Sequence, residues 1–289
     1  MSDPLRPRYP LFERNFVLQA SSRYHYWQGS GPLSIKTFAG GRALYRVDKR
    51  CFAVEERSWL LLNEGQPYTV SIESDTDVDS FCVFFRAGFA EEVCRDLTKP
   101  AEHLLDLPFD RPGGRLEFQE MTFPDDNLVT PLVGRLRAAM REEPGDPLLF
   151  EEHCHGLVHA LLRVQRKAGR DRDGLPAKRP STRQELFRRL TIAREYIHAH
   201  YRESISLEDI ARAAGLSPNH LLRGYRSLYG RTPYQHLSDN RLEEARRLLD
   251  RTGRSVTEIG LEIGFAEASS FNKMFKRLTG MSPQQYRNR

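Results

Sequence analysis

Two short stretches near the end of this chain carry basic and amide side chains at the spacing of one helical face. Arg223 and Arg226 lie in the first stretch, and Lys273 and Lys276 lie in the second. Arginine and lysine donate hydrogen bonds to guanine edges and phosphates, asparagine pairs with adenine, and serine suits either. The spacing predicts two faces that contact DNA, although any one of these side chains could belong to an ordinary solvated face. The candidate contacts are Ser217, Asn219, His220, Leu222, Arg223, Arg226, Ala268, Ser269, Asn272, Lys273 and Lys276.

Both stretches belong to a unit that occurs twice in the chain. Residues 207–237 are echoed by residues 256–287. Ile210 matches Ile259 at an offset of 49 residues, and the offset becomes 50 after one inserted residue. A repeated helix-turn-helix unit places two recognition helices on one polypeptide, and this arrangement is typical of DNA binding.

Helix start and stop signals support this division of each unit. Ser206 with Asp209, and Ser255 with Glu258, form capping boxes that satisfy free amide groups at a helix start. Glycines stand where helices should end, at Gly215, Gly230, Gly264 and Gly280. Each unit is therefore expected to hold a short helix, a turn and a longer helix. The apolar stripes of the longer helices should be buried, and they comprise Leu221, Tyr225, Leu228, Phe271, Phe275 and Leu278.

The segment between the two units sets their spacing. Residues 233–251 form one amphipathic pattern, which predicts a single helix. At about 1.5 Å per residue this helix is roughly 28 Å long, close to the ~34 Å of one turn of B-DNA. It could therefore place both recognition helices in successive segments of the major groove. If the helix stays rigid, the DNA must bend, and the sequence-dependent cost of bending adds to specificity.

The second unit carries a set of short motifs, namely Gly264-Phe265, Ser269-Ser270-Phe271, Phe275-Lys276, Gly280-Met281-Ser282-Pro283 and Tyr286-Arg287. These motifs resemble the signature of the AraC/XylS family of bacterial transcription regulators, and the resemblance covers about residues 184–289. It implies RNA polymerase as a partner. Lys273 stands where the family often has arginine, and lysine keeps the charge but loses the bidentate fork. Leu222 is an apolar residue on the first recognition face, where it could contact a thymine methyl group or simply pack.

The first half of the chain has a different pattern. Residues 32–86 contain short strand-like runs separated by turn residues, which predicts a small antiparallel barrel or sandwich. Helical patterns follow near residues 88–97, 127–143 and 147–168. This order resembles the sensor half of many AraC-type regulators, a cupin-like barrel with a helical dimerisation segment.

The expected fold class is two-domain α+β. An N-terminal cupin-like antiparallel β-barrel with a helical dimerisation segment precedes a C-terminal all-α domain with two helix-turn-helix units. The expected boundaries are residues 1–166 for the sensor and dimerisation domain and residues 183–289 for the DNA-binding domain. Residues 167–182 are rich in glycine, proline and mixed charge, which favours a flexible linker.

Charge and composition agree with this division. Residues 183–289 hold 19 Lys and Arg against 12 Asp and Glu, whereas residues 1–182 hold 25 against 27. The basic surplus therefore lies in the repeat region, as phosphate neutralisation requires. Residues 1–16 lack the apolar core of a signal peptide, and no stretch approaches the ~18 apolar residues of a membrane span. We expect four reduced thiols of a cytoplasmic protein, with a redox sensor as the alternative, at Cys51, Cys82, Cys94 and Cys154.

No residue set in the sequence predicts catalysis. Metal-binding cupins need a His-x-His pair with a glutamate and a later histidine, and His25 stands alone in Tyr24-His25-Tyr26-Trp27. That aromatic cluster could line a pocket, but we favour the core. Glu152, His155 and His159 share a helical face that could hold a metal, but the surrounding leucines favour a packing helix. We therefore expect no catalytic residue, no metal and no cofactor.

The sequence as a whole predicts a cytoplasmic, sequence-specific transcription regulator that forms a homodimer. We expect the barrel to bind a small-molecule effector of unknown identity and to favour one arrangement of the two domains when occupied. We favour an activator over a repressor, a choice that depends on where the DNA site lies relative to a promoter. Two other classes remain open. An enzyme with a fused DNA-binding module would be favoured by a bound metal, and an effector-free architectural or co-regulatory protein would be favoured by a barrel without a cavity.

Overall fold

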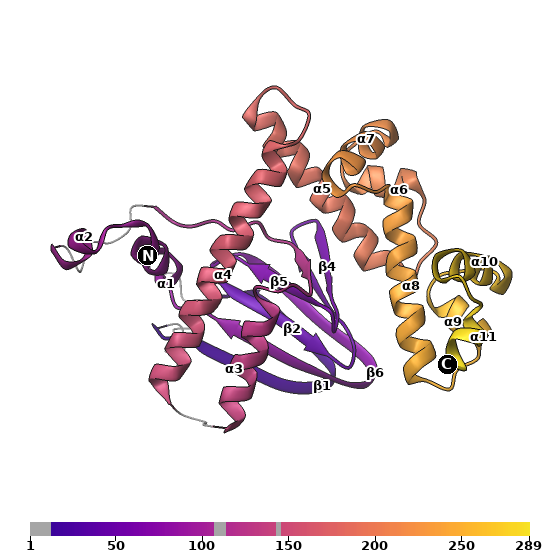
Figure 1. The fold of residues 1–289 in the computed structure, drawn as a ribbon, viewed down its shortest axis with the longest axis horizontal. Helices are drawn as coiled ribbons and strands as arrows, with labels where there is room; N and C mark the ends of the chain where they lie inside the picture. Colours follow the sequence, from indigo (N-terminus) through magenta and orange to yellow (C-terminus); the bar gives the residue numbers. More distant parts are fainter. Residues whose placement is uncertain (1–12, 107–113, 143–145) are drawn as a thin grey trace, which may run out of the picture. The chain divides into compact units, whose positions relative to one another are not determined.

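The structure, a computed structural model, describes residues 13–106, 114–142 and 146–289. The chain divides into two compact units, residues 1–170 and residues 171–289 (Figure 1). The first unit combines a β-barrel with helices, and the second is built from helices, as the sequence predicts. Most of the N-terminal segment considered above for a targeting signal lies outside the described residues.

The first unit is built on a seven-stranded antiparallel sheet that curls into a nearly closed barrel (Figure 1). Its strand order is β4-β3-β6-β2-β5-β7, and β1 pairs with β6. The long strand β6 holds the sheet together, because it pairs with β1 along one edge and with β2 and β3 along the other. The strands are β1 (Phe16–Ser30), β2 (Ser34–Ala39), β3 (Ala43–Val47), β4 (Arg50–Val54), β5 (Ser58–Leu62), β6 (Pro67–Phe84) and β7 (Thr122–Pro124).

Strands β1 and β6 differ from the sequence expectation. The sequence predicts strand-like runs over residues 67–72 and 78–86, with a turn at the polar residues 73–77 between them. Strand β6 instead continues through those polar residues, because β1 supplies hydrogen-bonding partners along its length. Strand β1 itself was not predicted. It carries the aromatic cluster that we expected in the core, and that expectation is wrong. Tyr24 is 70% exposed and Tyr26 is 68% exposed, because β1 pairs only with β6 among the described strands.

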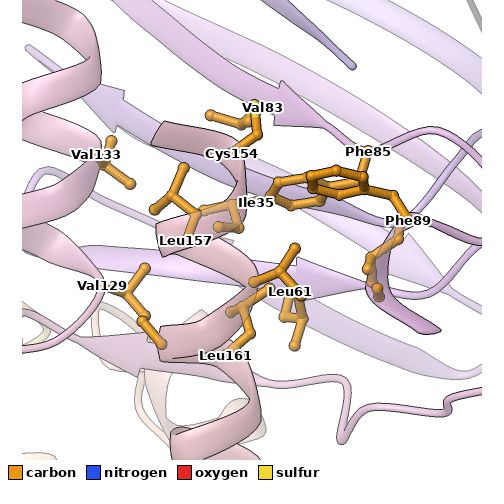
Figure 2. Close-up of a cluster of buried hydrophobic side chains, with 14 of the residues drawn as sticks. Ile35, Leu61, Val83, Phe85, Phe89, Val129, Val133, Cys154, Leu157 and Leu161 are labelled. Atoms are coloured by element: carbon orange, nitrogen blue, oxygen red, sulfur yellow. The ribbon is translucent and has the colours of Figure 1, made fainter. Parts of the chain in front are cut away.

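Alternate residues of the strands face two separate hydrophobic layers. One layer lines the inside of the barrel and includes Tyr45, Phe52 and Leu60. The other lies between the outer face of the sheet and the helices α1 (Phe89–Thr98), α3 (Thr130–Glu142) and α4 (Pro147–Asp173). Figure 2 shows the second layer, in which Leu157 and Leu161 of α4 point toward the sheet residue Leu61. A short helix, α2 (Ala101–Asp106), follows α1.

The predicted linker is shorter in the structure. Helix α4 continues to Asp173, so residues 167–173 of the expected linker are helical. Lysine, arginine and alanine have high helix propensity, which outweighs the cost of about 1 kcal/mol for the single Gly169 inside the helix. The segment without regular helix is residues 174–179, and the next helix begins at Pro180.

The second unit contains the two predicted helix-turn-helix motifs. Helix α8 lies between α6 and α7 on one side and α9, α10 and α11 on the other (Figure 1). The predicted capping boxes at Ser206 and Ser255 are both formed, and Thr232 and Ser282 form further ones. The helices are α5 (Pro180–His200), α6 (Leu207–Ala213), α7 (Pro218–Tyr229), α8 (Pro233–Arg251), α9 (Val256–Glu262), α10 (Ala268–Thr279) and α11 (Pro283–Arg287).

Three further expectations concern the described residues. No helix among them is long and apolar enough to cross a membrane. Within the same part of the chain, no group of His, Cys, Asp and Glu side chains is arranged to hold a metal ion. The cysteines Cys51, Cys82, Cys94 and Cys154 are all free.

Candidate nucleic-acid interface

Helix α7 presents the first set of predicted DNA contacts. The Ser217 hydroxyl caps the helix by accepting a hydrogen bond from the backbone amide of His220, at 3.4 Å. Leu221 and Tyr225 are fully buried, so the face of α7 that carries them packs against the rest of the second unit. The opposite side leaves five candidates exposed and Leu222 partly buried, and the exposed ones are Ser217, Asn219, His220, Arg223 and Arg226.

Helix α10 presents the second set in the same manner. Phe271 and Phe275 are fully buried in a cluster with residues of α8 and α9. The candidates Ser269, Asn272, Lys273 and Lys276 are exposed, and Ala268 is partly buried. The Ser269 hydroxyl donates a hydrogen bond to the Glu267 carboxylate, at 3.1 Å, so this serine is held at the start of the helix.

The two helices use equivalent positions. Asn219, Leu222, Arg223 and Arg226 stand at i, i+3, i+4 and i+7, and Ser269, Asn272, Lys273 and Lys276 repeat that spacing. The structure therefore places each predicted set on one face of its own helix. Two core expectations fail, because Leu278 at the end of α10 is 38% exposed and Leu228 at the end of α7 is only partly buried. Each lies in the last turn of its helix, beyond the buried stripe.

Several basic residues elsewhere in the second unit are already paired with a carboxylate. Arg188, Arg202 and Arg247 each form an ion pair with a glutamate. Within the described residues, no ion pair is formed by Arg223, Arg226, Lys273 or Lys276. Unpaired, exposed cations on a helix face are available to phosphates and base edges without first breaking an internal contact.

A buried carboxylate anchors α8, the helix that joins the two motifs. Glu244 is 7% exposed and accepts hydrogen bonds from Arg202, at 2.7 Å, and from Arg247, at 2.7 and 2.8 Å. Burial alone would raise the pKa of Glu244, but the hydrogen bonds and charges of Arg247 and Arg202 outweigh burial and lower it. The network ties α8 to the segment that follows α5, so the spacing of the two motifs is held by charge-assisted bonds.

Arg241 and Gly264 form a second bridge, which sequence reasoning missed. The Arg241 guanidinium donates to the backbone carbonyls of Tyr201 and Glu203, both at 2.8 Å, and lies over the Phe265 ring at 4.8 Å. Gly264 has a φ of +90°, and a Cβ there would lie 2.7 Å from the Arg202 carbonyl oxygen. The turn of the second motif therefore packs directly on the segment that precedes the first.

Comparisons with known proteins agree with this geometry. Residues 210–289 match the family model described as a helix-turn-helix domain. The chain is 35% identical over 249 residues to YdeC of Bacillus subtilis, an uncharacterised HTH-type transcriptional regulator, covering 86% of this chain and 80% of that protein. It is 33% identical over 129 residues to the MmsAB operon regulatory protein of Pseudomonas aeruginosa, covering 45% of this chain but only 36% of that protein.

A solved structure also matches the second unit. It is a transcriptional regulator with an AraC-type DNA-binding domain from Chromobacterium violaceum, 31% identical, with a TM-score of 0.33, covering 35% of this chain and 89% of that chain. The Bacillus subtilis relative, by contrast, matches both units of this chain. From the helix-turn-helix match and that relative together, this chain belongs to the AraC-type family of DNA-binding, helix-turn-helix transcriptional regulators.

Proposed function

We propose that this protein is a sequence-specific regulator that recognises a DNA site with two boxes, one for α7 and one for α10. The observation that carries the proposal is the pair of exposed faces with unpaired cations at equivalent helical positions. Arg223 and Lys273 are the leading base or phosphate contacts, and the polar neighbours on each helix assist them. The anchored helix α8 supports a fixed spacing between the boxes of about one helical turn.

Selection of bound fragments from sheared genomic DNA tests this proposal. Wild-type protein should enrich a site with two boxes about one helical turn apart. Arg223→Ala should relax sequence preference in one box and Lys273→Ala in the other. Arg188→Ala, which removes a basic residue that is 53% exposed and paired with Glu185 on α5, should leave the preference unchanged. Strong binding without sequence preference would contradict the proposal and point to an architectural role.

The first unit is proposed to control this binding. We infer that a small-molecule effector in the barrel favours one arrangement of the two units and hence one spacing of DNA half-sites. Family membership and the presence of a nearly closed barrel in the same chain as the DNA-binding unit support this inference. A ligand that stabilises the barrel should change DNA affinity or transcription. If it changes neither, the barrel does not control the DNA-binding unit.

The remaining features of the proposed function follow from the family. We propose that the protein acts in the cytoplasm as a homodimer, assembled through the helical segment of the first unit, and that it contacts RNA polymerase. We favour an activator over a repressor. Transcription from a promoter placed next to the selected site, with and without the protein, distinguishes the two, because an activator raises the transcript level.

A further inference from the structure

Lys36 is a cationic side chain inside the barrel. It lies on β2 between Ile35, which faces the helices, and Thr37, which bonds to β6 and to Arg137 of α3. Strand alternation therefore turns Lys36 to the opposite face, toward the inner hydrophobic layer. Lys36 is only 1% exposed and is among the largest fully buried side chains of the described residues.

The contacts of the Lys36 ammonium do not include a carboxylate. Its Nζ atom donates to the Tyr68 hydroxyl at 3.4 Å and lies 3.6 Å from the centre of the Phe84 ring. Burial lowers the pKa of Lys36 to about 8, so the side chain is mostly protonated at neutral pH. A buried cation without a counter-charge is costly, and proteins normally pair such a group.

Ser34 supplies a second, independent observation on the same face of β2. It stands two residues before Lys36, so both side chains point into the barrel. Ser34 is 1% exposed, and its hydroxyl has no hydrogen-bonding partner within the described structure. Buried hydroxyl groups are normally hydrogen-bonded, so the unbonded Ser34 hydroxyl is available to a ligand. Lys36, Ser34 and Tyr68 together offer hydrogen-bond donors. The titratable neighbour of Lys36 is the Cys82 thiol, and burial raises the pKa of that thiol, which disfavours the thiolate as a counter-charge.

We propose that the barrel interior binds a small organic monocarboxylate, with its carboxylate held by Lys36, Ser34 and Tyr68. The carboxylate supplies both the missing counter-charge for Lys36 and an acceptor for the Ser34 hydroxyl. An apolar body on the ligand suits the surrounding side chains Tyr45, Phe38 and Phe84. This inference rests on the proposed function, because it names the class of effector that the barrel senses.

The donor set argues against other ligand classes. A cationic amine would be repelled by the Lys36 ammonium. A neutral sugar would leave the charge of Lys36 uncompensated, and it offers hydroxyl groups where an anion is needed. A phosphate ester carries more negative charge than one buried lysine offsets. A monocarboxylate matches the single charge.

Aromatic side chains separate this donor set from solvent. The Trp27 ring lies on Tyr68, at 4.9 Å between centroids, and the Phe16 ring stacks on Phe84, at 4.5 Å. Tyr68 and Phe84 are each 8% exposed, whereas Trp27 is 38% exposed. Trp27 is one of two tryptophans in the chain. Because its ring contacts Tyr68, its fluorescence offers a local probe of ligand entry.

The test is a thermal-shift and fluorescence titration of the full chain with a defined panel. The panel consists of benzoate, phenylacetate and hexanoate, each compared with its uncharged amide. We expect at least one carboxylate to raise the melting temperature of the wild type by about 3 °C or more at saturation. Its amide should bind at least ~10-fold more weakly, because it cannot neutralise Lys36.

Two variants make the test specific to Lys36. Lys36→Met keeps the length and apolar stem but removes the buried charge, so the ligand-free variant should melt about 2–4 °C higher than the wild type. The same variant should lose the response to carboxylate. Lys49→Met makes the identical change at an exposed lysine between β3 and β4, and it should leave both properties unchanged.

Several outcomes would overturn the inference. Equal binding of carboxylates and amides, or no response to any carboxylate of the panel, would show that the site does not recognise a carboxylate. A lower melting temperature in ligand-free Lys36→Met would make Lys36 a structural residue. Trapping of benzaldehyde on Lys36 with cyanoborohydride, without any carboxylate effect, would assign a carbonyl ligand instead. Carboxylate binding that leaves DNA affinity unchanged would preserve this site and contradict the proposed control by the barrel.

Discussion

The cations on the two recognition helices are not chemically equivalent. Arg223 on α7 carries a planar guanidinium with a fork of donors, whereas Lys273, at the equivalent position of α10, carries a single ammonium group. Both side chains are exposed. An arginine can bond O6 and N7 of guanine together, whereas a lysine offers a point charge that suits phosphate as well as a base edge. The box bound by α7 should therefore be the more sharply defined of the two.

Lys273→Arg tests this difference directly. We expect the substitution to raise the preference for guanine at one position of the α10 box by about 1–3 kcal/mol, because the fork becomes available. In vitro selection of randomised duplexes measures that preference. Lys178→Arg makes the same change at an exposed lysine between α4 and α5 and should have no effect. An unchanged base preference in Lys273→Arg would place residue 273 against phosphate only.

Sequence patterns predicted which side chains of the proposed interface are exposed, but they did not predict the buried polar residues. The faces of α7 and α10 follow from the helical period, since Leu221 and Phe271 fix which side is buried. The Arg202–Glu244 ion pair joins residues that are 42 positions apart, so helical periodicity does not predict it. The burial of Lys36 could not be predicted either, because a lysine in a strand normally faces solvent. Such residues are placed by tertiary packing, which a single sequence does not encode locally.

The turn between α9 and α10 is the element whose geometry matters most for the spacing of the two helices. Gly264 has a positive φ, and its α-carbon faces the Arg202 carbonyl and the Arg241 guanidinium. A side chain at this position would be strained and would also push against the segment that follows α5. The turn thus sets how α9 and α10 sit on the rest of the second unit.

Gly264→Ala should destabilise the second motif by about 1–3 kcal/mol. Gly280→Ala is the matched control, because Gly280 has a φ of +82° but a Cβ there would meet nothing within 4 Å. Hydrogen exchange of the amides in α9 and α10 measures the local stability, and the loss should be larger for Gly264→Ala. Equal losses in the two variants would mean that left-handed strain, not the packing on Arg202, accounts for the effect.

Helices were easier to predict than strands for a physical reason. The start of α6 at Leu207 and of α9 at Val256 follows from capping residues within the segments themselves. Strand β1 has no such local signal, and its existence depends on pairing with β6, which lies about fifty residues further along the chain. The same pairing carries β6 through the polar residues 73–77 that suggested a turn.

The two units differ in how they should respond to acid. Among the described residues, the carboxyl and imidazole groups whose pKa values the fold lowers lie in the second unit. Burial and nearby cations lower the pKa of His236 to about 3, and hydrogen bonds from Arg188 and Arg189 lower the pKa of Glu185 to about 2. In the first unit, burial raises the pKa of Asp125. A lowered pKa means that the unfolded chain binds protons more readily than the folded one, so acid favours unfolding of the second unit.

Acidification should therefore unfold the DNA-binding unit before the barrel. His236 Nδ1 and the Tyr225 hydroxyl share a hydrogen bond of 2.6 Å. The stabilisation by His236 is complete above pH 6.5 and declines as the pH falls toward about 3. We expect a loss of about 1 kcal/mol per pH unit below pH 6. Both tryptophans, Trp27 and Trp59, lie in the first unit, so their fluorescence follows the barrel, whereas far-UV ellipticity also reports the second unit.

Melting curves from pH 7 to pH 4, followed by both signals, measure the order of unfolding. The ellipticity transition should move to lower temperature first, while the fluorescence transition stays in place. His236→Gln keeps an acceptor for Tyr225 but does not titrate, so it should flatten the ellipticity response between pH 6 and pH 4. A fluorescence transition that moves together with the ellipticity would mean that the two units unfold as one. The effector and the DNA would then act on a single cooperative fold, and control by rearrangement of two separate units would lose its physical basis.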